Sequence, residues 1–79
     1  MSCGNVVLPN LKYRRILGGT IRAYRKQAGF SQEKLAEKAD LHPVYISAVE
    51  RGAKNISMDT LIRITKVLGI RVRDLVEKI

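Results

Sequence analysis

The segment from Pro43 to Ala48 carries side chains suited to recognition: a serine hydroxyl, a tyrosine phenol and small apolar groups. If the segment is a helix with Ile46 pointing inward, a rotation of about 100° per residue turns Val44 and Ala48 to nearly the opposite side. Hydroxyls on that side can form hydrogen bonds with a partner, and methyl groups can pack against its apolar groups. The outward set consists of Pro43, Val44, Ser47 and Ala48, with Tyr45 and Arg51 at its margins.

Catalytic chemistry is not indicated by the chain. It has one histidine, His42, and one cysteine, Cys3, and the sequence contains neither a glycine-rich phosphate loop nor the spacing of a metal site. A single cysteine builds no disulfide framework, so we interpret Cys3 as a bystander. We therefore expect no enzyme activity, no metal, no cofactor and no small-molecule ligand.

Two short helices must position the outward set. Ser31 is a good N-cap, and it is followed by apolar residues at helical spacing, namely Leu35, Ala36 and Ala39. Pro43 fits only the first turn of a helix, so a second helix begins there and ends at Arg51–Gly52 in a left-handed cap. Two helices joined by about four residues form a helix-turn-helix, whose second helix can enter a DNA major groove.

Length and charge point to a single domain with a polyanionic partner. The chain has 79 residues and a net charge of +8, from 15 Lys and Arg against seven Asp and Glu. Such a balance in a small domain favours a polyanionic partner, the alternative being a basic surface that is merely solvated. With the helix-turn-helix, the expected partner is double-stranded DNA. We expect a tail over residues 1–10 and the DNA-binding domain over 11–79. No stretch suits a membrane span or a signal peptide, so a cytoplasmic location is expected.

The remaining periodicity predicts three more helices and no strand. A helix begins between Asn10 and Arg14 and ends at Ala28–Gly29, with Gly18–Gly19 weakening its early part. Ser57 caps a later helix that stops at Gly69. A last helix follows, although Arg71 is a poor cap for it. The fold class is all-α, a compact five-helix bundle containing the helix-turn-helix. Apolar stripes support the three helices: Leu17, Ile21, Tyr24 and Ala28; Leu61, Ile64 and Leu68; Val72, Leu75, Val76 and Ile79.

These residues resemble a known family. The phrases Ser31-Gln32-Glu33, Leu35-Ala36, Ile46-Ser47 and Glu50-Arg51-Gly52 are similar to those of the Cro/phage-repressor-type (XRE-like) helix-turn-helix proteins, over about residues 16–79. Tyr45-Ile46-Ser47, followed by Lys54-Asn55-Ile56-Ser57, most resembles the controller proteins of restriction–modification systems. The resemblance implies a lambda-repressor-like DNA-binding domain that regulates transcription.

The resemblance also implies contacts with the DNA backbone. It places the Gln32 side chain on a phosphate, at a helix N-terminus whose free N–H groups already favour an anion. It places Lys54 and Asn55 in a loop over the phosphates near the operator centre. Arg51 is a further phosphate candidate and also complements the helix dipole. His42 is either a substitute N-cap or a phosphate contact.

Glu50 faces inward in the predicted helix and needs a cation. The resemblance implies that Arg25 is this partner and that the pair joins the first helix to the recognition helix. Arg22, one turn earlier, is the competing partner. We interpret the pair as structural, because losing one partner of a buried pair costs about 3–5 kcal/mol.

Base readout is expected to be modest. Arg on guanine and Asn or Gln on adenine give strong discrimination, and none of them lies on the outward face. The controller family often has Arg where this chain has Pro43, so that guanine contact cannot be transferred. Ser47, Tyr45 and the methyl groups remain, and DNA shape and deformability should supply much of the preference.

A two-fold homodimer is expected, because one such domain covers only a half-site. Apolar residues of the last two helices that a monomer would struggle to bury are the candidate interface, with the alternative that they complete the monomer core: Met58, Ile62, Val72, Leu75 and Ile79. Recognition helices about 34 Å apart would then fit a roughly palindromic operator.

The function that follows is a homodimeric transcription regulator, either a restriction–modification controller or a small phage-type repressor. The alternative from another class is an antitoxin that binds a toxin protein and regulates its own gene. The apolar run Val6 to Leu8 either folds back on the core or stays mobile.

Overall fold

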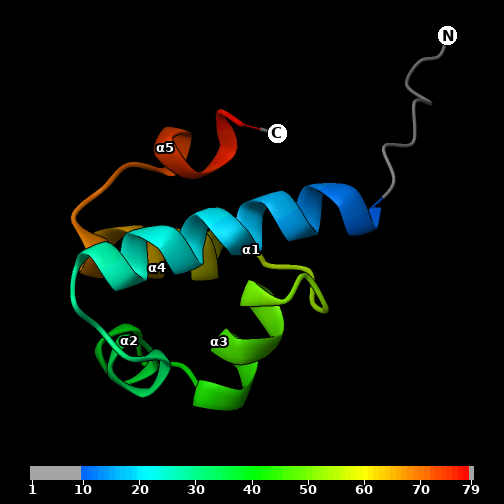
Figure 1. Ribbon diagram of the computed structural model, residues 1–79. Helices are drawn as coiled ribbons and strands as arrows, with labels where there is room; N and C mark the ends of the chain where they lie inside the picture. Colours follow the sequence, from blue (N-terminus) through cyan, green and yellow to red (C-terminus); the bar gives the residue numbers. More distant parts are fainter. Residues whose placement is uncertain (1–9, 79) are drawn as a thin grey trace, which may run out of the picture.

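The computed structural model describes residues 10–78, which form five α-helices and no strand, as the sequence predicts (Figure 1). The helices are α1 (Asn10–Gln27), α2 (Gln32–Ala39), α3 (Pro43–Glu50), α4 (Met58–Leu68) and α5 (Val72–Val76). The first helix begins within the predicted window and ends just before the predicted Ala28–Gly29. Cys3, Val6 to Leu8 and Ile79 lie outside the described residues.

Helix α1 is the central element of the fold. It runs between α5 on one side and the α2–α3 pair on the other, with α4 behind it in the view of Figure 1. The buried core draws apolar residues from all five helices, among them Leu17, Ile21, Leu35, Ala36, Ile46, Val49, Leu61, Ile64 and Leu75. The predicted apolar stripes therefore pack against one another. Helices α2 and α3 lie together at one end of the molecule.

Capping residues fix where the helices begin. Ser31 Oγ accepts the N–H of Lys34 at 2.9 Å, and Ser57 Oγ accepts the N–H of Thr60 at 3.1 Å, as expected. The N-terminus of α5 is held differently: the N–H of Arg71 donates to Asp74 Oδ2 at 2.9 Å. Asp74 thus supplies the cap that the Arg71 side chain does not.

Left-handed residues fix where the helices end. Asp40 closes α2 with φ 58°, which Asp tolerates better than most residues. Gly52 and Gly69 follow α3 and α4 with φ 77° and 70°. The tight turn between α2 and α3 therefore forms with Asp, and not glycine, in the left-handed position.

Gly18 has a role that the sequence did not reveal. The residue is buried, and a Cβ on it would lie 2.7 Å from the carbonyl oxygen of Glu50 and closer still to that of Val49. The missing side chain lets α1 approach the last turn of α3 at backbone distance. Gly18 is thus a packing residue, whereas Gly19 is exposed and has no neighbour within 4 Å of such a Cβ.

The described part of the chain has neither a helix suited to span a membrane nor a cluster of metal-binding side chains. Between residues 10 and 78 no helix combines the length and apolar character needed to cross a membrane. The same residues contain no group of His, Cys, Asp or Glu side chains that could hold a metal ion.

Candidate DNA interface

The helix-turn-helix presents an open hollow where the N-terminus of α2 meets the outer face of α3. Val44 is 67% exposed there, and Pro43 and Ser47 are half-buried. The hollow brings these three predicted base-reading residues together with the start of α2. Its lining consists of Arg25, Ser31, Gln32, Glu33, Pro43, Val44 and Ser47.

Two predicted base-reading residues are placed elsewhere. Ala48 was expected on the outward face, but it is 8% exposed. The chain turns back after α3, where the N–H of Ala53 donates to the Ala48 carbonyl at 2.9 Å. The prediction that Ala48 faces outward was wrong, because it placed each residue only by its rotation about the helix axis relative to the inward Ile46. Tyr45 packs against the core, and its hydroxyl donates to the carbonyl of Asn55 over a long 3.4 Å.

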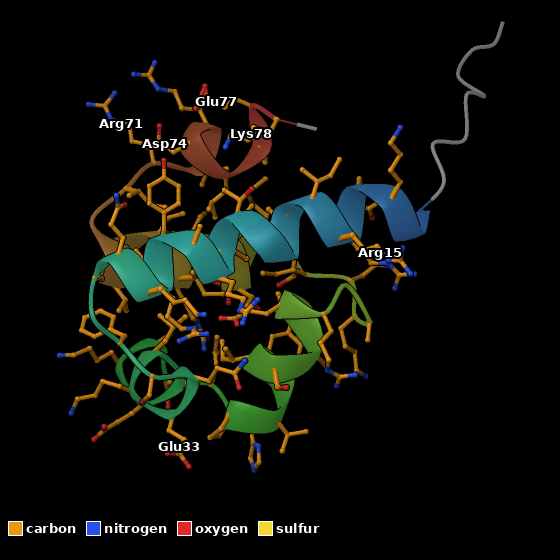
Figure 2. The ribbon with its side chains drawn as sticks, in the orientation of Figure 1. Arg15, Glu33, Arg71, Asp74, Glu77 and Lys78 are labelled. Atoms are coloured by element: carbon orange, nitrogen blue, oxygen red, sulfur yellow. The ribbon has the colours of Figure 1, made fainter. Side chains whose placement is uncertain are left out.

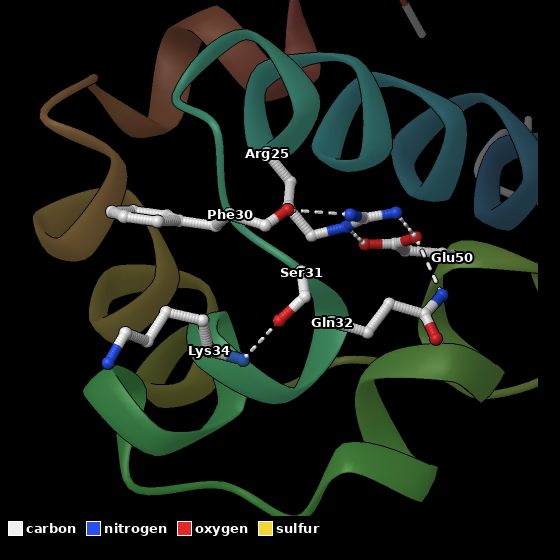
Figure 3. Close-up of polar contacts among 6 residues, drawn as sticks. All are labelled: Arg25, Phe30, Ser31, Gln32, Lys34 and Glu50. Atoms are coloured by element: carbon white, nitrogen blue, oxygen red, sulfur yellow. Dashed lines mark hydrogen bonds and ion pairs between the residues drawn. The ribbon is translucent and has the colours of Figure 1, made fainter.

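The predicted ion pair between Arg25 and Glu50 is present (Figure 3). Arg25 Nε donates to Glu50 Oε2 at 2.6 Å, and Arg25 Nη2 donates to Glu50 Oε1 at 3.0 Å. Both side chains are buried, so the pair joins α1 to α3 within the core. Arg22, the competing partner, is exposed.

Gln32 belongs to the same network. Its Nε2 donates to Glu50 Oε1 at 3.0 Å, while Arg25 Nη1 donates to the carbonyl of Phe30 at 2.8 Å (Figure 3). Glu50 therefore binds the first residue of α2 as well as α1. A carboxamide nitrogen has a second N–H, which leaves Gln32 able to donate to a phosphate while it stays on Glu50.

His42 caps the recognition helix. Its Nδ1 accepts the N–H of Val44 at 3.1 Å, so its role as a substitute N-cap is confirmed. In the neutral imidazole this places the proton on Nε2. The exposed ring can then donate outward from the end of α3 that lines the hollow.

The loop after α3 carries the other predicted phosphate contacts. Arg51, Lys54 and Asn55 are all exposed. The Asn55 side chain is already engaged, because Tyr13 of α1 donates its hydroxyl proton to Asn55 Oδ1 at 2.9 Å. Sequence reasoning missed this contact, since 42 residues separate the two side chains and no local pattern links them.

The candidate dimer residues divide into two groups. Met58 and Ile62, one turn apart on α4, are 62% and 40% exposed. Leu75 is fully buried in the core, and half-buried Val72 packs against that core, because the short α5 folds back on α1. The prediction for Leu75 was therefore wrong, and this residue completes the monomer core.

A second hollow lies between α1 and α5, on the side of α1 away from α3. Its lining includes Tyr24, Asp74, Glu77 and Lys78. Figure 2 shows Asp74 on α5 and Glu77 and Lys78 just after that helix, far from Glu33 at the other end of the molecule. Its charged side chains are of both signs, and none of the residues predicted for base readout or phosphate contact lines it.

Comparison with known proteins gives consistent matches. Residues 21–75 match the family model described as Helix-turn-helix. The control protein C.BamHI of Bacillus amyloliquefaciens is 43% identical over 65 residues, which cover 81% of this chain and 80% of that protein.

Two solved structures closely resemble the structure of this chain. The restriction-modification controller protein C.AhdI of Aeromonas hydrophila is 34% identical with a TM-score of 0.77, covering 78% of this chain and 94% of that one. The N-terminal DNA binding domain of SinR from Bacillus subtilis is 37% identical with a TM-score of 0.74, covering 77% and 90%.

Proposed function

The chain belongs to the helix-turn-helix family of DNA-binding transcription regulators, and we propose that it works as a restriction–modification controller that binds a roughly palindromic operator as a homodimer. The observation that carries this proposal is the hollow between α2 and α3. It gathers the N-terminal turn of α2 and the outward side chains of α3 on one open face.

Base readout is assigned to Pro43, Val44 and Ser47. The Ser47 hydroxyl can hydrogen-bond to any base edge, and the Val44 methyl groups can pack against a thymine methyl. These contacts discriminate weakly, so DNA shape and deformability supply the rest of the preference. Tyr45 acts on the loop instead of on bases, because its hydroxyl contacts Asn55.

Phosphate contacts flank this reading surface on two sides. Gln32 and the free N–H groups of the first turn of α2 lie on one side. Arg51, Lys54 and Asn55 lie on the other, and the His42 Nε2 proton is a further donor. The excess of cations in the chain supports this arrangement, because each neutralised phosphate releases counterions.

The homodimer is proposed to form through Met58 and Ile62. They lie on one face of α4, and Val76 on the adjacent α5 is a further exposed apolar residue. Burying such residues against their symmetry copies is the isologous contact expected of a two-fold dimer.

Selection of bound sites from random DNA, followed by titration at several salt concentrations, tests the function. Arg51 and Lys54 supply two cations per protomer. A homodimer therefore neutralises at least four phosphates. We expect a plot of log K against log salt concentration to have a slope of about −4 or steeper, at roughly −0.9 per phosphate. Arg51→Ala should make the slope shallower by about 2, because a dimer loses two contacts. Failure to enrich any sequence, or an affinity unaffected by salt, would show that the proposed function is wrong.

A further inference from the structure

The loop between α3 and α4 is held in place by two tyrosines that come from different helices. Tyr13 on α1 donates to the Asn55 side-chain oxygen at 2.9 Å, and Tyr45 on α3 donates to the Asn55 backbone oxygen at 3.4 Å. Asn55 is exposed, so neither hydrogen bond is needed to satisfy a buried group. The two contacts fix the position of one surface residue.

The start of this loop also packs against α1. A Cβ on Gly52 would lie 2.9 Å from Arg15 Cγ and 3.0 Å from the Arg15 backbone nitrogen. Figure 2 shows Arg15 on the half of α1 next to the loop. The first turns of α1 therefore support the loop through backbone packing at Gly52 and through a hydrogen bond at Asn55.

In this structure the Tyr13 hydroxyl donates to the oxygen of the Asn55 amide, and this contact leaves the nitrogen end available to a partner. An amide oxygen accepts hydrogen bonds and an amide nitrogen donates them. Since Tyr13 donates to Oδ1, it keeps the oxygen on the α1 side and leaves the Nδ2 hydrogens for other acceptors. A DNA phosphate only accepts, so this orientation is the one that a backbone contact requires.

We propose that Tyr13, which lies outside the helix-turn-helix, is a positioning residue for DNA binding: it holds Asn55 with its amide N–H groups toward a phosphate. This inference rests on the proposed function, because Asn55 contacts a phosphate only if the chain binds DNA as proposed. It assigns to α1 a part in DNA affinity besides its packing in the core.

Tyr13→Phe tests the proposal, because it removes only the hydroxyl and keeps the ring. Tyr24→Phe is the matched control, since it removes a hydroxyl from the same helix at the hollow between α1 and α5. We expect the affinity of Tyr13→Phe for the selected operator to fall about four- to hundredfold, because a dimer loses two hydrogen bonds of about two- to tenfold each. Amide hydrogen exchange in the free protein should become faster over residues 53–56. Tyr24→Phe should change neither measurement.

A double-mutant cycle with Asn55→Ala separates positioning from general support of the fold. In the Asn55→Ala background, Tyr13→Phe should have no further effect on affinity, because the hydrogen bond is already lost. Additive losses would overturn the proposal, as would equal affinities for Tyr13→Phe and Tyr24→Phe while the unaltered chain binds DNA. If the unaltered chain itself fails to bind DNA, the proposed function is wrong, and this inference fails with it.

Discussion

At the scale of single residues, Glu50 is the residue on which the DNA interface depends. Its carboxylate accepts hydrogen bonds from Arg25 of α1 and Gln32 of α2 while its own backbone ends α3. A buried carboxylate is costly unless charge and hydrogen bonds compensate it, and here both do. One side chain thus sets the relative positions of the three helices.

Arg25→Met should lower the free energy of unfolding by about 3–5 kcal/mol, because it leaves the Glu50 charge buried without its cation. Arg22→Met is the control, since Arg22 is exposed one turn earlier, and it should change stability by no more than about 0.5 kcal/mol. Urea denaturation of the two variants measures the difference. Equal stabilities would contradict the structural role of the pair.

At the scale of elements, the packing of α1 against α3 decides the geometry of the reading surface. Gly18 allows the two backbones to meet, and the Arg25–Glu50 pair fixes the contact about two turns further along α1. Because α3 carries Val44 and Ser47 on its outer side, any shift of α3 against α1 also moves the groove-facing side chains.

Gly18→Ala and Gly19→Ala should have opposite effects on stability although the residues are adjacent. At Gly18 the new methyl group would clash with backbone carbonyls of α3, which should cost about 1–3 kcal/mol. At Gly19 the methyl group meets open space, and higher helix propensity should stabilise the protein by up to about 1 kcal/mol. Thermal melts compare the two, and stabilisation by Gly18→Ala would show that the close approach is absent.

The sequence predicted elements and local caps well, and it predicted long-range contacts poorly. Ser31, Ser57, Pro43 and Gly69 act within a few residues of themselves, so their patterns locate the helix ends directly. Ala48 was misplaced because its burial depends on how the rest of the chain packs around α3, which the rotation along one helix does not give. The Tyr13–Asn55 contact depends on how α1 lies against that loop, which periodicity along one helix does not encode.

At the scale of the whole molecule, the candidate DNA contacts and the candidate dimer contacts lie on different helices. The α2–α3 face carries the candidate DNA contacts, α4 presents Met58 and Ile62, and the hollow between α1 and α5 lies on the far side of α1. A dimer through α4 would leave both reading surfaces free. Dimerisation and DNA binding can therefore be tested with separate substitutions.

Ile62→Lys should convert a dimer into a monomer and weaken operator binding by more than tenfold. A lysine opposite its symmetry copy places like charges in an apolar contact, whereas its added positive charge alone would favour DNA. Ala23→Lys is the control, because it adds the same charge at an exposed residue of α1 and should leave the assembly unchanged. Size-exclusion chromatography with light scattering at tens of micromolar gives the masses. A monomeric mass for the unaltered chain would contradict the proposed homodimer.

Backbone amide chemical-shift mapping during titration with a selected operator duplex tests the central claim most directly. The largest changes should fall at Gln32, at Val44 and Ser47, and at Lys54 and Asn55, with little change at Ala23 and Glu77 beside the α1–α5 hollow. Perturbations concentrated at that hollow, with Val44 and Ser47 unaffected, would contradict the conclusion that the α2–α3 face binds DNA.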